Sequence, residues 1–283
     1  MRIGFIGAGR VGYTMGKYLA LEGCDITGYY SRTYEHAEDA SRFTDTRCFK
    51  NAEDLINECD AVFLTVNDSC IKTVFDEIKT IPGLSGKIVC HTSGALSSKV
   101  FEDASCQVYG YSIHPVYAVS DRYTSYKDFS NAFITIEGHE KYLSDIRNVF
   151  SCAGFETEVV STDEKIKYHA ACTIASNFVC GIYGMAADLL EQCGFNQNTA
   201  EKALNGLFLD NAKGIVEKGA VGQLTGPLER GDAETLRKHL SVLSDEDKSL
   251  YLSVSQEILK IAKRKNKDRS YSEIENLLKG GQL

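Results

Sequence analysis

The sequence predicts an α/β protein with a mostly parallel sheet domain at residues 1–160 and an all-α domain at residues 161–283. Three observations predict this organisation. Apolar runs of strand length alternate with helical patterns through the first half, which is typical of parallel strands joined by crossover helices. A glycine-rich turn follows the first run, and no convincing strand follows Val160. A chain of 283 residues can form two domains that each bury a core.

The strands of the first domain are expected at residues 3–6, 25–30, 61–66, 87–90, 108–113, 133–136 and 156–160. Helices of crossover length separate the early strands. Alternation of this kind predicts a parallel sheet with helices on both faces.

The second domain is expected to consist of helices at residues 161–194, 199–218, 233–241, 245–265 and 272–279. The first of these opens with a capping box, in which Ser161 and Glu164 satisfy each other's backbone donors. It is long and rich in Ala, Gly and Cys, so we expect it to be packed on several sides, including by a second copy of the chain.

Composition restricts the class of protein. The 31 Lys and Arg against 39 Asp and Glu give a formal net charge of -8, which argues against a nucleic-acid-binding surface. No run of about 18 apolar residues occurs and a strand begins at Arg2, so we expect no membrane span and a cytoplasmic location. The ten cysteines form no C-x-x-C pair, which indicates buried thiols in a reducing compartment and predicts no metal site.

The glycine-rich turn has the G-x-G-x-x-G spacing and reads Gly7, Ala8, Gly9, Arg10, Val11 and Gly12. It follows a strand and opens a helix, which is the context of a dinucleotide-binding Rossmann-type domain. Gly7 would allow the tight turn, Gly9 the approach of the diphosphate and Gly12 the close packing of helix on strand. The alternative is a glycine turn that binds no ligand.

The residues after the second strand indicate which dinucleotide is bound. An NAD enzyme places Asp or Glu there to bind the ribose 2′-hydroxyl, whereas this chain has Ser31, Arg32 and Thr33. Hydroxyls and a guanidinium suit a 2′-phosphate, so we expect NADP(H). The alternative is that Arg32 is a solvated loop cation.

Two further strand ends should reach the cofactor, because ligands of open α/β sheets bind beyond the carboxyl ends of the strands. These segments contain Val66, Asn67 and Asp68, and Thr92, Ser93 and Gly94. We expect the second segment to line the nicotinamide and Ser93 to contact the substrate as well. Asp68 could equally be the N-cap of the next helix.

Several phrases carry a resemblance to known proteins: His91-Thr92-Ser93-Gly94, Ile113-His114-Pro115, Tyr168-His169-Ala170-Ala171, Ser176-Asn177, Leu224-Thr225-Gly226-Pro227 and Arg230-Gly231-Asp232. With these phrases the sequence resembles the β-hydroxyacid dehydrogenase and pyrroline-carboxylate reductase superfamily over most of its length. More closely, it resembles Rossmann-fold NADP oxidoreductases whose helical second domain has no known function. The resemblance implies a dimer-forming helical domain and a reductase-like cleft.

One departure concerns the first helix of the second domain. The related hydroxyacid dehydrogenases carry Lys-x-x-x-Asn there, and no such pair occurs between residues 165 and 194. The nearest equivalent is a row of residues spaced by four along one helix face, namely Lys165, His169, Thr173 and Asn177.

The candidate catalytic residues follow from the need for a proton donor beside the hydride donor. We expect His169 in this role, with Asn177 orienting the substrate and His114 as the second candidate. Thr173 and Arg230 are expected to bind substrate. The alternatives are a hydrogen-bonded core histidine at position 169 and, for the Arg230 turn, a connection between helices with Asp232 as N-cap. For His91 we favour a hydrogen bond within its loop.

Two functions remain open from the sequence. The first is an NADP(H)-dependent oxidoreductase acting on a small keto, hydroxy or imino compound. The second is an NADP(H)-binding regulator or scaffold without chemistry. Titratable residues on the helix of His169 favour the enzyme, because a binding module does not need them.

Overall fold

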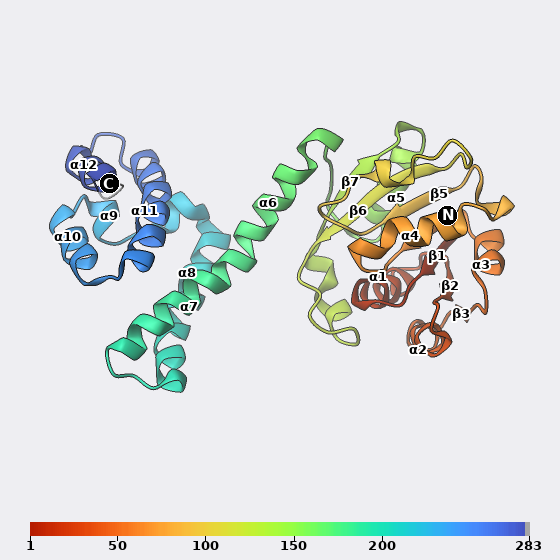
Figure 1. Ribbon diagram of the computed structural model, residues 1–283, viewed down its shortest axis with the longest axis horizontal. Coiled ribbons are helices and arrows are strands. Elements are labelled where there is room, and N and C mark those ends of the chain that lie inside the picture. The colour runs from red at the N-terminus through yellow and green to blue at the C-terminus, as the bar shows by residue number, and fades with distance from the viewer. Residues whose placement is uncertain (281–283) are drawn as a thin grey trace. The chain divides into compact units, whose positions relative to one another are not determined.

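The computed structural model describes residues 1–280, which form two compact units, Met1–Ser176 and the chain from Asn177 onward (Figure 1). The boundary expected at residue 160 therefore precedes the division between the units. The reason lies in the helix that starts near residue 162, whose first turns are hydrogen-bonded to the sheet, as described below.

The first unit contains one eight-stranded sheet in the order β3-β2-β1-β4-β5-β6-β7-β8. Its strands are β1 Ile3–Ile6, β2 Ile26–Tyr30, β3 Arg47–Cys48, β4 Ala61–Leu64, β5 Ile88–His91, β6 Tyr109–Val116, β7 Phe133–Gly138 and β8 Thr157–Val159. All neighbouring pairs are parallel except β6 and β7. The sequence predicted every strand but β3, which is too short to show a periodicity.

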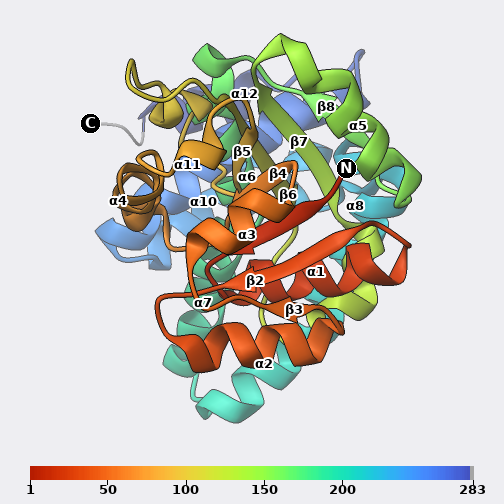
Figure 2. The same ribbon diagram turned by 90° about the vertical axis from the view of Figure 1, so that its right-hand side faces the viewer.

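Helices cover both faces of this sheet. They are α1 Arg10–Leu21, α2 Tyr34–Thr44, α3 Ala52–Glu58, α4 Asp68–Ile78 and α5 Leu143–Cys152, with short 3-10 helices η1 Pro82–Leu84, η2 Ser98–Phe101, η3 Ser125–Asn131, η4 Glu140–Tyr142 and η5 Thr162–Glu164. The apolar cluster on one face joins Tyr13 of α1 and Phe150 of α5 to Phe5. On the other face, Leu55 of α3 and Phe75 of α4 pack on Val62. Figure 2 shows α2 and α3 on opposite sides of the sheet.

The order in which strands are added to the sheet changes side at β1 and β4. Strands β2 and β3 extend the sheet to one side of β1, whereas β4 and all later strands extend it to the other. In open α/β sheets such a reversal leaves a crevice at the carboxyl ends of the two central strands, where ligands bind. This position coincides with the glycine turn after β1.

Within residues 177–280 the second unit contains helices joined by short connections and no strand. Its helices are α7 Asn177–Gln192, α8 Gln197–Gln223, α9 Pro227–Arg230, α10 Ala233–Val242, α11 Asp245–Lys265 and α12 Ser272–Gly280. Leu236, Leu259 and Ile274 join α10, α11 and α12 in one apolar core. The predicted fold class is therefore confirmed. The sequence analysis missed α9 and ended the second helix too early, because α8 continues beyond a kink at Gly219.

The long helix predicted over 161–194 is interrupted. Helix α6, Lys165–Ala175, ends before Ser176, whose dihedral angles of -117° and -75° are not those of a regular helix, and α7 begins at the next residue. The expected capping box is absent: the backbone N–H of Glu164 donates to the carbonyl of Ser161, and the Glu164 carboxylate binds Lys167 instead.

The helical stretch Thr162–Gln192 is long and apolar enough to span a membrane by length and composition alone, with a mean hydropathy of 1.4. Only 6% of its most apolar window is buried, so the dense packing expected for it is not provided by one copy of the chain. The expectation of buried thiols was also wrong in part, because Cys180 and Cys193 on and after α7 are exposed, as are Cys70 and Cys152.

Candidate active site

The glycine turn after β1 is dictated by close contacts with the end of β4. Gly7 has a φ of +94°, and a Cβ there would lie 2.5 Å from Val66 Cγ1. A Cβ at Gly9 would lie 2.8 Å from the carbonyl oxygen of Thr65, and one at Gly12 would lie 2.4 Å from Thr65 Oγ1. Thr65, the first residue of the strand end expected beside the cofactor, also donates to the Gly7 carbonyl at 2.7 Å. Each glycine is therefore required for a separate steric reason.

The N-terminus of α1 is open to an anion. Gly9 is its N-cap and provides no side chain, and the first turn contains no acidic residue. The free N–H groups and the positive end of the helix dipole attract a phosphate group. The guanidinium of Arg10 is exposed and donates to the carbonyl of Ser120 at 3.2 Å. These residues fit a dinucleotide diphosphate.

The residues expected at the 2′-phosphate follow β2 and lie beside this turn, since Gly7 N donates to the carbonyl of Tyr30 at 2.8 Å. Ser31 is half-buried, whereas Arg32 and Thr33 are exposed. Within residues 1–280 no hydrogen bond or ion pair engages the side chains of these three residues. They are therefore available to a ligand.

The segment after β4 shows that Asp68 is not the N-cap of the next helix, which was one of the two alternatives for this residue. Helix α4 has Asn67 as its N-cap, without a side-chain capping bond, and Asp68 is its first residue. The Asp68 carboxylate instead accepts a hydrogen bond from Ser93 Oγ at 2.5 Å. Asp68 thus connects the ends of β4 and β5, while Val66 packs against Gly7.

The loop after β5 is ordered by its own polar groups. The hydroxyl of Ser93 accepts from the N–H groups of Ala95 and Leu96, and the Ser93 carbonyl accepts from Ser112 Oγ. With 4% exposure and these bonds, the Ser93 hydroxyl is engaged within the loop rather than free for a substrate. The Ser93 N–H donates to Nδ1 of the fully buried His91, which is the loop hydrogen bond favoured from the sequence. Burial lowers the pKa of His91 to about 4.

His114, on β6, belongs to a hydrogen-bonded chain that the sequence analysis did not foresee. Its Nδ1 lies 2.6 Å from the hydroxyl of Tyr168 on α6. Thr135 Oγ1 of β7 donates a hydrogen bond to the same hydroxyl at 2.8 Å. Burial, together with the nearby charge of Lys165 and with His169, lowers the pKa of His114 to about 4. His114 is therefore a neutral imidazole at pH 7.

Three side chains attach the start of the helix to the sheet by hydrogen bonds. Thr162 donates to the buried carboxylate of Glu137 at 2.7 Å, and Lys165 Nζ donates to Ser112 Oγ at 2.6 Å. Tyr168 follows one turn later. Thr162, Lys165 and Tyr168 are spaced by three residues, which places their side chains on one helix face. This spacing could have predicted that the face packs on the sheet. Lys165 is only 2% exposed, and burial lowers its pKa.

His169 lies next to His114 over the loop after β5. The two imidazole rings have centroids 6.3 Å apart at an angle of 70°. A Cβ at Gly94 would lie 2.6 Å from His169 Cδ2 and 2.9 Å from His114 Nε2. Gly94 is thus the contact point of both candidate proton donors, which the sequence analysis had placed on separate elements.

The other predicted site residues lie on the rest of the helical row and in the second unit. Thr173 Oγ1 donates to the His169 carbonyl of its own helix at 3.1 Å. Asn177 and Arg230 are exposed residues of the second unit, and the break at Ser176 interrupts the expected helical row. Asp232 is the N-cap of α10 and accepts a hydrogen bond from Thr235 N at 3.0 Å. This was the alternative stated for the turn that contains Arg230. Roles for Asn177 and Arg230 stay predictions.

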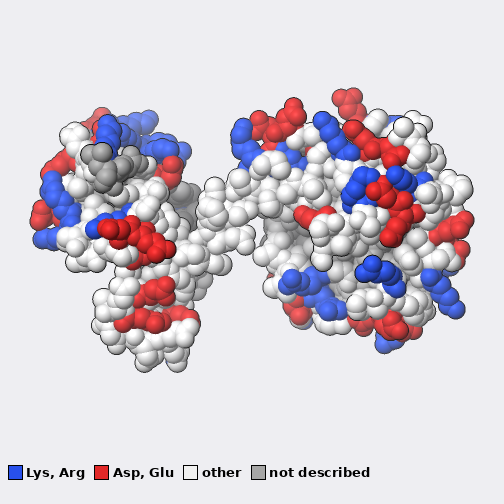
Figure 3. Space-filling view, in the orientation of Figure 1, with Lys and Arg blue, Asp and Glu red and all other residues white. Residues whose placement is uncertain are grey.

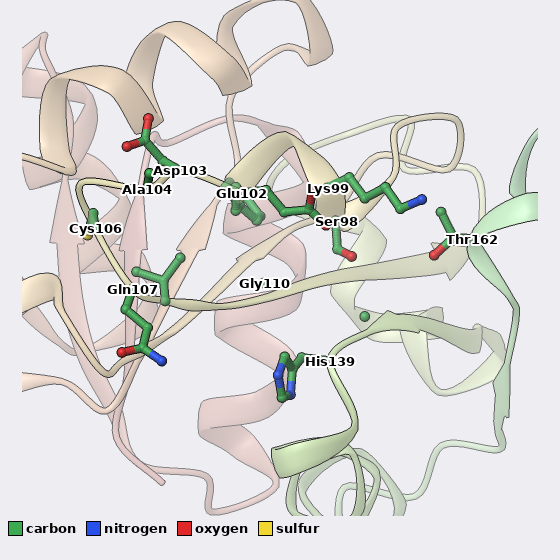
Figure 4. Close-up of a pocket in the computed structure, with 13 residues that line it drawn as sticks. Ser98, Lys99, Glu102, Asp103, Ala104, Cys106, Gln107, Gly110, His139 and Thr162 are labelled. Atoms are coloured by element: carbon green, nitrogen blue, oxygen red, sulfur yellow. The ribbon is translucent and has the colours of Figure 1, made fainter.

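A cavity of about 810 Å³ lies elsewhere in the first unit (Figure 4). Figure 4 shows Lys99 and Thr162 toward one end of it and Asp103 toward the other. None of the predicted site residues lines this cavity. The glycine turn and the two histidines therefore form a site distinct from it.

The fold and the glycine turn define a dinucleotide-binding protein of the Rossmann type. Residues 2–93 match the family described as "NADP oxidoreductase coenzyme F420-dependent", and residues 132–258 match the "Domain of unknown function (DUF2520)". The chain therefore combines an NADP oxidoreductase domain with a DUF2520 domain, which confirms the resemblance stated from the sequence. Comparison with curated proteins finds no match.

Solved structures share the fold over nearly the whole chain. Protein TM1727 from Thermotoga maritima is 23% identical with a TM-score of 0.74, covering 93% of this chain and 99% of its own. A candidate NADP oxidoreductase, BF3122 from Bacteroides fragilis, is 21% identical with a TM-score of 0.72 and covers 92% and 98%. A pyrroline-5-carboxylate reductase from Coxiella burnetii is 20% identical with a TM-score of 0.64 and covers 93% and 97%. At these identities the likeness concerns the fold.

Proposed function

We propose that the protein is an NADP(H)-dependent oxidoreductase that transfers a hydride to or from a small keto, hydroxy or imino compound. The observation that carries this proposal is the meeting of His114 and His169 over Gly94. This point lies at the carboxyl ends of β5 and β6, in the same sheet and at the same edge as the glycine turn. A binding module has no need for two imidazoles in such a position.

The cofactor would be held by the groups described above. The N–H groups at the start of α1 suit the diphosphate, and Ser31 and Arg32 suit a 2′-phosphate. When bound, the nicotinamide supplies or accepts the hydride. Since no carboxylate follows β2, we propose that NADPH is preferred to NADH.

The two histidines would have different tasks. His114 is neutral at pH 7, so it offers an N–H as a hydrogen-bond donor and not a readily transferred proton. Such a donor polarises a carbonyl or imine for hydride attack. We assign proton transfer to His169, which is half-buried on α6. The Coxiella protein of similar fold is named for a cyclic imine, which supports imino compounds as part of the substrate class.

We also propose a cytoplasmic homodimer. In the second unit, large apolar side chains are exposed on α7 and α8, including Phe178 at 57%, Leu207 at 73% and Val216 at 87%. Over the middle of α6 the surface in Figure 3 is likewise uncharged. Large apolar side chains with this exposure are unfavourable in water and are typical of a subunit interface. A second copy of the chain is the partner that we propose for it.

The proposed reaction is tested by following NADPH oxidation with a panel of small keto acids, aldehydes and cyclic imines. His169→Asn should reduce turnover about 10² to 10⁴-fold while NADPH binding is unchanged, because a general acid acts on the reaction and not on the dinucleotide. His139→Asn, at an exposed histidine, is the matched control and should keep full activity. Tight NADPH binding without oxidation by any compound would instead indicate the non-catalytic alternative.

A further inference from the structure

We infer that Tyr168 is a positioning residue, which holds His114 in the tautomer that carries its proton on Nε2. The inference deepens the proposed function, because it specifies which atom of His114 faces the substrate. No other residue of the described chain is as well placed for this task, since the Tyr168 hydroxyl lies 2.6 Å from Nδ1.

The first step is the direction of the hydrogen bonds. The Tyr168 oxygen accepts the proton of Thr135 Oγ1 at 2.8 Å, so its own proton is free to be donated elsewhere. Nδ1 of His114, 2.6 Å from the hydroxyl oxygen, is the acceptor that we infer for that proton. Burial raises the pKa of Tyr168, so the phenol keeps its proton throughout the neutral range. An Nδ1 that accepts a hydrogen bond carries no proton of its own.

The second step is the state of the other ring nitrogen. His114 is neutral at pH 7, so its single ring proton must then reside on Nε2. Nε2 lies 2.9 Å from the position of a Cβ at Gly94. Within residues 1–280 it has no hydrogen-bond partner. It is not fully buried, whereas the unpaired Nε2 of His91 is. The N–H is therefore free and open beside Gly94.

The third step is the rigidity of the arrangement. Lys165 lies one turn before Tyr168 and is anchored to Ser112 of β6, two residues before His114. Thr135 lies opposite His114 in the antiparallel pair of β6 and β7. The phenol is thus fixed from both the helix and the sheet. The titratable groups near enough to influence the charge of His114 are Lys165, His169, Asp68 and His91.

The decisive experiment is nitrogen NMR of the full-length protein with ¹⁵N-labelled histidine, recorded between pH 6 and 8 without substrate, with His114→Asn to assign the signals. The wild-type protein should show His114 with a proton on Nε2 and an unprotonated Nδ1. In Tyr168→Phe, which removes only the hydroxyl, we expect a mixture of tautomers. A wild-type Nδ1–H, or an unchanged single tautomer in Tyr168→Phe, would overturn the inference.

Activity provides a separate readout once a substrate is known. Tyr168→Phe should lower kcat about threefold to tenfold with little change in KM for NADPH, which is the range of one lost hydrogen bond. Tyr126→Phe is the matched control, because Tyr126 packs on Phe43 and makes no hydrogen bond to His114, so it should show neither effect. The NMR result decides the tautomer without any turnover, so failure of the inference and failure of the proposed reaction are distinguishable.

Discussion

Acidification should destabilise the first unit through His91, and the effect can be calculated from its burial. His91 is fully buried, it packs against Phe101, and its Nε2 has no hydrogen-bond partner within residues 1–280. Burial disfavours the charged form, so the pKa falls from 6.5 in the unfolded chain to about 4 in the folded unit. The unfolded chain therefore binds the proton first as the pH falls.

The sign and size of the effect follow from this difference. Above pH 6.5 the histidine is neutral in both states and stability is unaffected, whereas between pH 6.5 and 4 protonation favours the unfolded chain. The full difference corresponds to about 3.4 kcal/mol, of which about 2 kcal/mol is lost between pH 7 and pH 5. His114, with a similar pKa, adds a loss in the same pH range.

The assay compares the wild-type protein with His91→Asn, which retains an acceptor for the N–H of Ser93. Urea unfolding at pH 7, 6 and 5 is followed by hydrogen exchange and mass spectrometry of peptides from β5, so that the first unit is observed by itself. The wild-type protein should lose about 2 kcal/mol more than the variant between pH 7 and pH 5. Equal losses in both proteins would refute a buried neutral histidine at this position.

Three further outcomes are expected. Gly12→Ala should abolish detectable NADPH binding in calorimetric titration, because its Cβ would lie 2.4 Å from Thr65 Oγ1 and displace α1, whereas Gly181→Ala, with no atom within 4 Å of its Cβ, should bind normally. Arg32→Ala should weaken NADPH about ten- to hundredfold and leave NADH unchanged, and equal losses for both dinucleotides would contradict a 2′-phosphate contact. Val216→Asp should convert a dimer into a monomer in light scattering at micromolar concentration, because a charge at an apolar interface lacks a partner, and a monomeric wild-type protein would reject the proposed interface.

The geometry of the glycine turn could be predicted in detail from the sequence, whereas the contacts of His114 and Ser93 could not. Gly7, Gly9 and Gly12 act through the backbone of a local turn, so their spacing already contains the steric argument. Ser93 was assigned to the substrate from its position alone, and its contacts with Asp68 and Ala95 show that its hydroxyl orders the loop. A side chain's position along the chain does not reveal which polar groups from other elements will engage it.

The sequence by itself determined seven of the eight strands, most of the helices, the glycine turn and the change to an all-α second half. These features depend on periodicity and turn chemistry, which are properties of neighbouring residues. Only the tertiary structure decided that His114 meets Tyr168, 54 positions later, and that Lys165 reaches Ser112, 53 positions earlier. Such pairs depend on which turn of α6 docks on which strand, and that choice is made by packing and hydrogen bonding across the whole first unit.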